Sequence, residues 1–244
     1  MGADAGAAGA CYVPAGVAAL ARLLRLASPT LPVGAYSYSQ GLEWAIEAGT
    51  VSDPASAQRW ISDALRYSLA RFEAPVWWRM YHCWRRGDAP AAARWNDMFV
   101  ASRETAELRA ETLQMGGSLR RLLSDLDEQG PGELDPLLAM EAPAYVSVAA
   151  FAAAAWGIPD RAALTGYCWS WMENQVLAAI KAVPLGQLAG QRMLSVLEPV
   201  MGMPWTRPSA ARTMRLRILR PDNSCSRSSQ ENNPAPVPIF ARDP

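Results

Sequence analysis

The sequence predicts an all-α protein, built as a single-domain helical bundle with a disordered tail rich in Pro, Arg and Ser. Apolar residues recur at three- and four-residue spacing through most of 17–198, and no alternating β pattern of useful length occurs. Half of the 244 residues are hydrophobic and 19% are charged, which favours a packed globule. We therefore expect a flexible N-terminus at 1–16, a helical domain at 17–198 and a tail at 199–244.

The first two helices are predicted from their ends as much as from their periodicity. A helix over Val17–Leu26 should stop before Ser28-Pro29, because a residue that precedes proline avoids the α region. A loop follows. Asp53-Pro54 then forms a good helix start, a cap followed by a first-turn proline. Its apolar face is formed by Trp60, Ile61, Leu65 and Leu69.

The middle of the chain predicts a tryptophan-rich helix and a long one after it. The first covers Pro75–Arg86 and is closed by Gly87. Asp88 can cap the second, which continues to about Leu126. We expect Gly116-Gly117 to be the place where that helix breaks or kinks.

Three further helices are predicted in the last third of the domain. Pro143–Trp156 ends at Gly157, Asp160 caps a helix over 161–183, and Pro184 begins a last helix that reaches about Glu198. The uncharged stretch 142–159 is nearly long enough for a membrane span. Because it is mostly alanine and contains two prolines and a glycine, a buried helix is the better interpretation.

The tail changes in character, with prolines interrupting a stretch of Arg and Ser. We interpret it as a solvated disordered segment. Its basic run could instead bind phosphate or an acidic partner; that run is Arg212, Arg215, Arg217 and Arg220.

Several classes of function are excluded by what the chain lacks. The 23 basic and 23 acidic residues cancel, so bulk charge gives no attraction to nucleic acid or membrane. The chain has no P-loop or G-x-G-x-x-G motif, no nucleophile elbow and no C-x-x-C pair. His82 is the single histidine, and we assign it, with Cys83, to packing. No signal peptide is evident, and the four dispersed cysteines fit a reducing cytoplasm.

Large aromatic residues at helical spacing are usually part of a core or an interface between subunits. We assign the following tryptophans to core or dimer packing: Trp77, Trp78, Trp84, Trp169 and Trp171.

Three segments are more unusual than core packing requires. Ser28–Glu43 (SPTLPVGAYSYSQGLE) is a dense Pro/Gly/Tyr/Ser loop leading into a helix. Arg103–Gly116 places Arg103, Glu107 and Glu111 one helical turn apart, as on a solvated charged face. Lys181–Gln191 (KAVPLGQLAGQ) contains the chain's one lysine and is typical of a junction between helices.

In this order and spacing, the three segments resemble the UreF family of urease accessory proteins. The block at Ser28–Glu43 is the most specific, the E-x-R-x-E-T-x-x-M-G pattern lies within Glu104–Gly116, and P-L-G-Q-x-x-G-Q stands at Pro184–Gln191. The similarity extends from about Leu20 to Leu197. Two positions depart from the family: Ala35 stands where a second glycine is common, and the tail has none of the family's usual His-Glu ending, which either divergence or a shifted reading frame would explain.

The resemblance implies an all-helical, homodimeric, cytoplasmic maturation chaperone and not an enzyme. It would bridge a UreD/UreH-type scaffold and the UreG GTPase, so that nickel reaches apo-urease through the complex. Nickel and GTP would then be handled by the partners, this chain would hold no cofactor, metal or catalytic residue, and neither nucleic acid nor a membrane would be involved.

The matching positions imply three sets of partner-facing residues. The first set lies in the loop and consists of Pro29, Leu31, Pro32, Gly34, Tyr36, Ser37, Ser39, Gln40, Gly41 and Glu43. In this set, Glu43 is either an electrostatic contact to the GTPase or a helix cap. The second is Lys181, Gln187 and Gln191. The third, which could equally form a salt-bridge network or the dimer interface, is Arg103, Glu104, Arg109, Glu111 and Thr112.

Two other functions stay open at this stage. The chain could regulate the partner's GTPase directly, as an activator or as a fidelity gate. Less in keeping with the charge balance, it could bind nucleic acid through the arginines of the tail, which would show as steeply salt-dependent binding lost on deleting Met203–Pro244.

Overall fold

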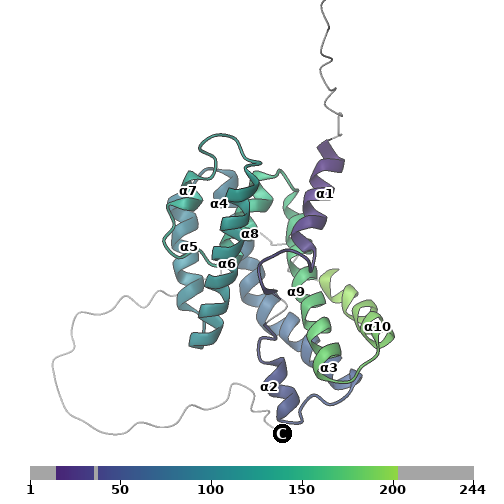
Figure 1. Ribbon diagram of the computed structural model, residues 1–244. Helices are drawn as coiled ribbons and strands as arrows, with labels where there is room; N and C mark the ends of the chain where they lie inside the picture. Colours follow the sequence, from purple (N-terminus) through teal and green to yellow (C-terminus); the bar gives the residue numbers. More distant parts are fainter. Residues whose placement is uncertain (1–14, 36–37, 203–244) are drawn as a thin grey trace, which may run out of the picture. The chain divides into compact units, whose positions relative to one another are not determined.

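The computed structural model describes residues 15–35 and 38–202, and throughout these residues it is helical with no strand (Figure 1). The predicted all-α class is confirmed. The elements are α1 (Ala15–Ala27), α2 (Leu42–Glu47), α3 (Pro54–Asp63), η2 (Ala64–Glu73), α4 (Ala74–Arg85), α5 (Ala89–Ala101), α6 (Ala106–Leu126), α7 (Asp135–Leu138), α8 (Tyr145–Ala155), α9 (Asp160–Ala182), α10 (Gln187–Leu197) and η3 (Glu198–Gly202).

The ends of the helical domain differ slightly from the predicted ones. Helix α1 begins at Ala15, and at the other end Val200 and Met201 are buried in the short 3₁₀ helix η3. The folded body therefore reaches a few residues beyond the predicted limits of 17 and 198. The predicted flexible start and the predicted tail lie mostly outside the described residues.

The helix start at Asp53-Pro54 is confirmed in detail. The Asp53 carboxylate accepts from the Ser56 backbone N–H at 2.8 Å, while the Ser56 hydroxyl accepts from the Asp53 N–H at 3.1 Å. From here the chain stays helical to Arg85, through the π-helical segment η2. The predicted tryptophan-rich helix over Pro75–Arg86 is confirmed as α4, which continues directly from η2 and carries Pro75 in its first turn.

The single long helix predicted from Asp88 to Leu126 is two helices, α5 and α6. The Ser102 hydroxyl donates to the Phe99 carbonyl at 2.6 Å at the end of α5, and Thr105 caps α6 by accepting from the Leu108 N–H at 3.2 Å. The chain therefore breaks at 102–105, whereas Gly116-Gly117 lie inside α6. Arg103 consequently shares no helical face with Glu107, which corrects the predicted charged face.

The last helices keep their predicted order with shifted starts. Pro159, and not Asp160, occupies the N-cap of α9. Helix α10 begins at Gln187, since Gly186 has an extended backbone and Pro184 and Leu185 precede it outside the helix. The short helix α7 was not predicted, because four residues are too few to show a periodicity.

Helix α8 is buried on every side by α4, α5, α6 and α9. Every residue from Val146 to Ala154 is buried, which confirms that the uncharged stretch 142–159 contains a buried helix, although the helix itself covers only Tyr145–Ala155. Helix α6 approaches its start closely, because a Cβ on Gly116 would lie 2.0 Å from the Pro143 carbonyl oxygen. Within the described residues, no helix is long and apolar enough to cross a membrane.

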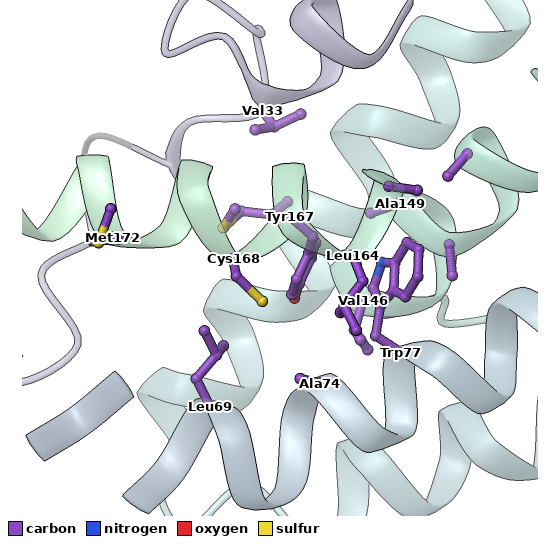
Figure 2. Close-up of a cluster of buried hydrophobic side chains, with 14 of the residues drawn as sticks. Val33, Leu69, Ala74, Trp77, Val146, Ala149, Leu164, Tyr167, Cys168 and Met172 are labelled. Carbon is purple, nitrogen blue, oxygen red and sulfur yellow. The ribbon is translucent and has the colours of Figure 1, made fainter. Parts of the chain in front are cut away.

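Helix α9 is the common support for the other helices: α1, α2, α3, α4, α8 and α10 all pack against it (Figure 1). Figure 2 shows Leu69, Ala74 and Trp77 of the η2–α4 run facing Leu164 and Cys168 of α9. A Cβ on Gly166 would lie 2.5 Å from the Leu23 side chain of α1, so this glycine lets the two helices approach.

The aromatic residues mostly follow the sequence prediction. Trp77 is fully buried, and Trp78, Trp84, Trp169 and Trp171 are partly buried against the same core. His82 packs between Trp78 and Tyr81, and its Nε2 lies 3.6 Å from an Asp160 carboxylate oxygen. Cys83 and Cys168 are buried free thiols.

Candidate functional site

The loop from Ser28 to Gly41 is anchored on the body by its apolar residues and by its turns. Leu31 and Val33 belong to the buried core. Gly34 and Gly41 have φ values of 80° and 89°, a left-handed backbone conformation that favours glycine over residues with a side chain. Gln40 adopts a φ of 50° although it carries a side chain. The Ser39 hydroxyl accepts from the Glu43 N–H at 3.3 Å where α2 begins.

Helix α9 holds this loop through the side chain of Asn174, which the sequence did not point to, and through that of Trp171, which was expected only to pack. The Asn174 amide donates to the carbonyls of Ala35 at 2.9 Å and Tyr38 at 3.1 Å. The Trp171 indole N–H donates to the Gln40 side-chain oxygen at 2.6 Å. These bonds satisfy loop carbonyls that no regular secondary structure would pair.

Helix α6 fastens the loop from the opposite side. The Gln40 amide donates to a Glu111 carboxylate oxygen at 2.8 Å, and the Tyr38 hydroxyl donates to the Gln114 side chain at 2.6 Å. The Gln40 side chain thus bridges α9 and α6. Two of the three segments singled out from the sequence therefore meet in space.

A pocket with a cavity volume of about 70 Å³ lies where the loop, α6, α9 and the end of η2 converge. Its walls are mainly apolar and aromatic, with a few polar groups among them, as is usual for a binding site. The lining residues are Leu26, Ser28, Pro29, Leu31, Val33, Ala35, Gln40, Glu73, Phe99, Arg103, Leu108, Glu111, Thr112, Met115, Tyr145, Tyr167, Ser170, Trp171 and Asn174.

Glu73, the last residue of the π-helical segment, organises one side of the pocket. It accepts from the Tyr167 hydroxyl at 2.5 Å and lies 3.5 Å from an Arg103 guanidinium nitrogen. Burial first, and the neighbouring Glu73 carboxylate second, raise the pKa of Tyr167 well above its usual value. The Arg103 guanidinium also lies over the Phe99 ring, 4.1 Å from its centroid.

Glu111 occupies the other side. Its side chain is buried, with the residue only 7% exposed, and burial raises the pKa of its carboxyl group while the Gln40 hydrogen bond opposes the shift. Burial likewise raises the pKa of Tyr145 to about 12. A carboxylate in such surroundings binds a cation or a strong hydrogen-bond donor far better than it would in water.

The predicted site residues fall into groups. Those that line the pocket are Pro29, Leu31, Gln40, Arg103, Glu111 and Thr112. Five are exposed and do not line the pocket: Pro32, Gly41 and Glu43 in or next to the loop, Glu104 between α5 and α6, and Arg109 on α6. Gly34 and Ser39 shape the loop, and Tyr36 and Ser37 lie outside the described residues.

The third predicted set is separate from the pocket. Lys181 lies in the last turn of α9, and Gln187 and Gln191 lie on α10. All three are exposed and none lines the pocket. The sequence resemblance thus covers two surfaces, and the structure joins only the first two segments into one site.

The residues that the sequence analysis missed are those contributed by distant elements: Glu73, Phe99, Tyr145, Tyr167, Ser170 and Asn174. Trp171 was assigned to packing alone, but it also donates the hydrogen bond to Gln40. No local pattern marks Glu73 or Asn174, since Tyr167 and the loop carbonyls to which they bond lie many tens of residues away. An acidic residue amid an apolar helix, as at Glu73, is the one signal that was available.

No group of three or more His, Cys, Asp or Glu side chains in the part of the chain that the structure describes could hold a metal ion. The pocket itself offers two carboxylates beside a guanidinium. Its chemistry is therefore that of a hydrogen-bonding and ion-pairing surface.

The sequence pattern of the UreF family matches residues 51–198, which is more than half of the chain. This chain belongs to the UreF family. A urease accessory protein UreF from Azoarcus sp. is 59% identical over 184 residues, covering 75% of this chain and 79% of that protein. The corresponding protein from Dechloromonas aromatica is 54% identical over 179 residues, 73% of this chain and 78% of its own.

A third relative of this UreF family member has a different organisation. The bifunctional urease accessory protein UreEF from Bordetella bronchiseptica is 52% identical over 178 residues. The matched region covers 73% of this chain and 41% of that relative. The UreF region therefore also occurs within a longer polypeptide.

Proposed function

We propose that this UreF family member is a urease maturation chaperone. It bridges a UreD/UreH-type scaffold and the UreG GTPase, and in this way supports GTP-dependent insertion of nickel into apo-urease. It acts as a homodimer in the cytoplasm, by contact and not by catalysis, with nickel and GTP held by its partners. Family membership and relatives named as urease accessory proteins support this role.

The observation that carries the proposal is the loop 28–41, which is the family's most specific segment here. Five hydrogen bonds from Tyr38, Gln40, Trp171 and Asn174 fix it to α6 and α9. A loop ordered before binding loses less conformational entropy when a partner docks. A partly exposed loop whose described residues are held in place by these bonds suits a protein that acts through its surface.

The bifunctional relative supports the same role from another direction. Its name, bifunctional urease accessory protein UreEF, assigns two functions to one polypeptide. Joining two modules in one chain raises their effective concentration for each other. A UreF region that works within an assembly of accessory proteins is consistent with that arrangement.

The first test is co-purification of the full chain with the scaffold and the GTPase, scored by size-exclusion mass. The proposal predicts one complex that contains all three proteins. A folded chain that binds neither partner would contradict it.

Activation of apo-urease by nickel and GTP in the reconstituted mixture is the second readout. Glu43→Gln and Lys181→Gln should lower activation while the variants remain folded. Glu47→Gln on the same short helix as Glu43, and Arg192→Gln on α10, are the matched exposed controls. Normal activation by both test variants would remove these residues from the proposed contacts.

The same mixture separates a bridge from a regulator of the GTPase. A bridge leaves the rate of GTP hydrolysis unchanged when this chain is added alone to the GTPase. A rate that rises would instead favour an activator, and a rate that falls would favour a fidelity gate.

A further inference from the structure

The pocket contains more negative than positive charge. Glu73 and Glu111 are two carboxylates, and Arg103 is the one guanidinium among the lining residues. That guanidinium is already engaged, because it lies 3.5 Å from Glu73 and stacks over Phe99 at 4.1 Å. Glu73 is further satisfied by the Tyr167 hydroxyl.

Glu111 is the other carboxylate, and the charge of Arg103 acts on it only from beyond salt-bridge distance. It is 7% exposed and accepts a hydrogen bond from the neutral Gln40 amide. Among the described residues, no salt bridge reaches it. Burying a carboxylate without a paired charge is costly, so a positive group that entered the pocket would be bound strongly.

The walls of the pocket select the kind of cation. Aromatic rings of Phe99, Tyr145 and Trp171 and the apolar side chains of Leu31 and Leu108 line it. Aromatic faces attract organic cations, and apolar walls accommodate the alkyl stem that carries such a charge. A cavity of about 70 Å³ holds roughly five water molecules, at about 10–15 Å³ each, which suits the end of one long side chain.

We propose that this pocket receives one lysine or arginine side chain of a partner protein, whose charged end pairs with Glu111. This inference rests on the proposed function, since it supplies the chemistry of one contact within the assembly. A bare divalent ion fits less well, because Glu111 is a single available ligand and a metal ion needs several.

Small side-chain analogues test the pocket without any partner. n-Butylammonium and ethylguanidinium are titrated into the full ¹⁵N-labelled chain, and the indole N–H signal of Trp171 is followed; that N–H bonds to Gln40, the partner of Glu111. The signal is assigned by its loss in Trp171→Phe. Saturable shifts are expected with both cations, and at least about tenfold weaker shifts with the neutral analogues butanol and ethylurea, as for loss of one buried ion pair.

Two variants and one control define the site. Glu111→Gln should weaken binding of both cations by at least about tenfold. Leu108→Trp fills the pocket but keeps Glu111, and it should also weaken binding of both cations by at least about tenfold. This second variant keeps the test valid if Glu111→Gln does not fold. Glu107→Gln, exposed on the same helix, should bind as the original chain does. Equal binding of neutral and cationic analogues, or no shift with any of them, would overturn the proposal.

A titration with nickel chloride tests whether the pocket binds a metal ion instead of an organic cation. A Trp171 shift with Ni²⁺ that Glu111→Gln abolishes, in the absence of binding by the organic cations, would overturn the proposal in favour of a metal site. Organic-cation binding that Ni²⁺ does not displace supports it.

Co-purification with the scaffold and the GTPase then separates this inference from the proposed function. If the original chain forms the complex and Glu111→Gln weakens it at least about tenfold, a partner side chain occupies the pocket. If the complex forms equally well with both, the partner contact is overturned while the proposed function stands. If the chain binds the cations but neither partner, the proposed function fails and so does the partner contact.

Discussion

The surroundings of α8 and the pocket beside α6 are built in opposite ways. Helix α8 is an alanine-rich segment buried on every side, and its packing is apolar and spread over many side chains. The pocket is held by single hydrogen bonds, such as Gln40 to Glu111 and Asn174 to the loop carbonyls. A packed core is destabilised by overpacking or by cavities, whereas the pocket wall is destabilised when one hydrogen-bond donor is removed. The two regions should therefore respond to different substitutions.

The largest effect is expected where α6 touches the start of α8. Gly116→Ala places a methyl group 2.0 Å from the Pro143 carbonyl oxygen, and backbone on both sides resists movement. We expect a loss of about 3 kcal/mol in the free energy of unfolding, measured in urea. Gly117→Ala, with nothing within 4 Å, is the matched control and should stabilise the helix by up to about 1 kcal/mol. Equal values for the two variants would mean that α6 and α8 do not make this close contact.

The pocket side of the comparison is tested by Asn174→Ala. It leaves the Ala35 and Tyr38 carbonyls without their shared donor, and we expect a loss of about 2 kcal/mol in unfolding free energy. Hydrogen exchange should also become faster at loop amides such as those of Val33 and Leu42. Gln187→Ala, an exposed amide on α10, should change neither quantity. Unchanged exchange in the loop would show that Asn174 does not hold it.

The same contrast explains what could be predicted from the sequence. Composition was enough to predict the buried helix α8 within the stretch 142–159, because an apolar stretch without charges has few other options. The break at 102–105 was missed because Ser102 and Thr105 are weak local signals. Only the caps they form in the folded chain mark the two ends.

The candidate site was predictable only in part. Family resemblance identified Gln40, Arg103 and Glu111, but it gave no reason to connect the first of them with the third. Their link depends on a turn at Gln40 with positive φ and on a partner 71 positions away. Glu73 and Asn174 contribute through contacts of the same long range, which no local pattern encodes.

A local feature that the sequence did predict should have an intermediate effect. Asp53→Ala removes the acceptor of the Ser56 N–H at the start of α3, and loss of such a cap costs about 1 kcal/mol of unfolding free energy. Asp63→Ala, exposed at the other end of α3, is the control and should change stability by less than about 0.5 kcal/mol. Thermal unfolding of the three proteins measures the difference. A cost at Asp53 as large as that at Asn174 would mean that local caps and long-range bonds contribute equally.

The smallest effect is a pH dependence that separates the buried carboxyl group of Glu111 from an exposed one on the same helix. Burial raises the pKa of Glu111 above its ordinary value of 4.5, so between the two values the folded chain keeps a proton that the unfolded chain has lost. This group's contribution to the unfolding free energy therefore falls as pH rises from 4.5 through the folded pKa. Glu107 behaves oppositely, because hydrogen bonds from its own backbone N–H and from Thr105 lower its pKa, and its contribution is lost as pH falls.

Unfolding measured at about pH 4 and about pH 7 should show that Glu111→Gln gains stability relative to the original chain as pH rises, and that Glu107→Gln does not. If both variants follow the original chain in parallel, the Glu111 carboxyl group is solvated, and the pocket loses the unpaired buried charge on which its proposed cation depends.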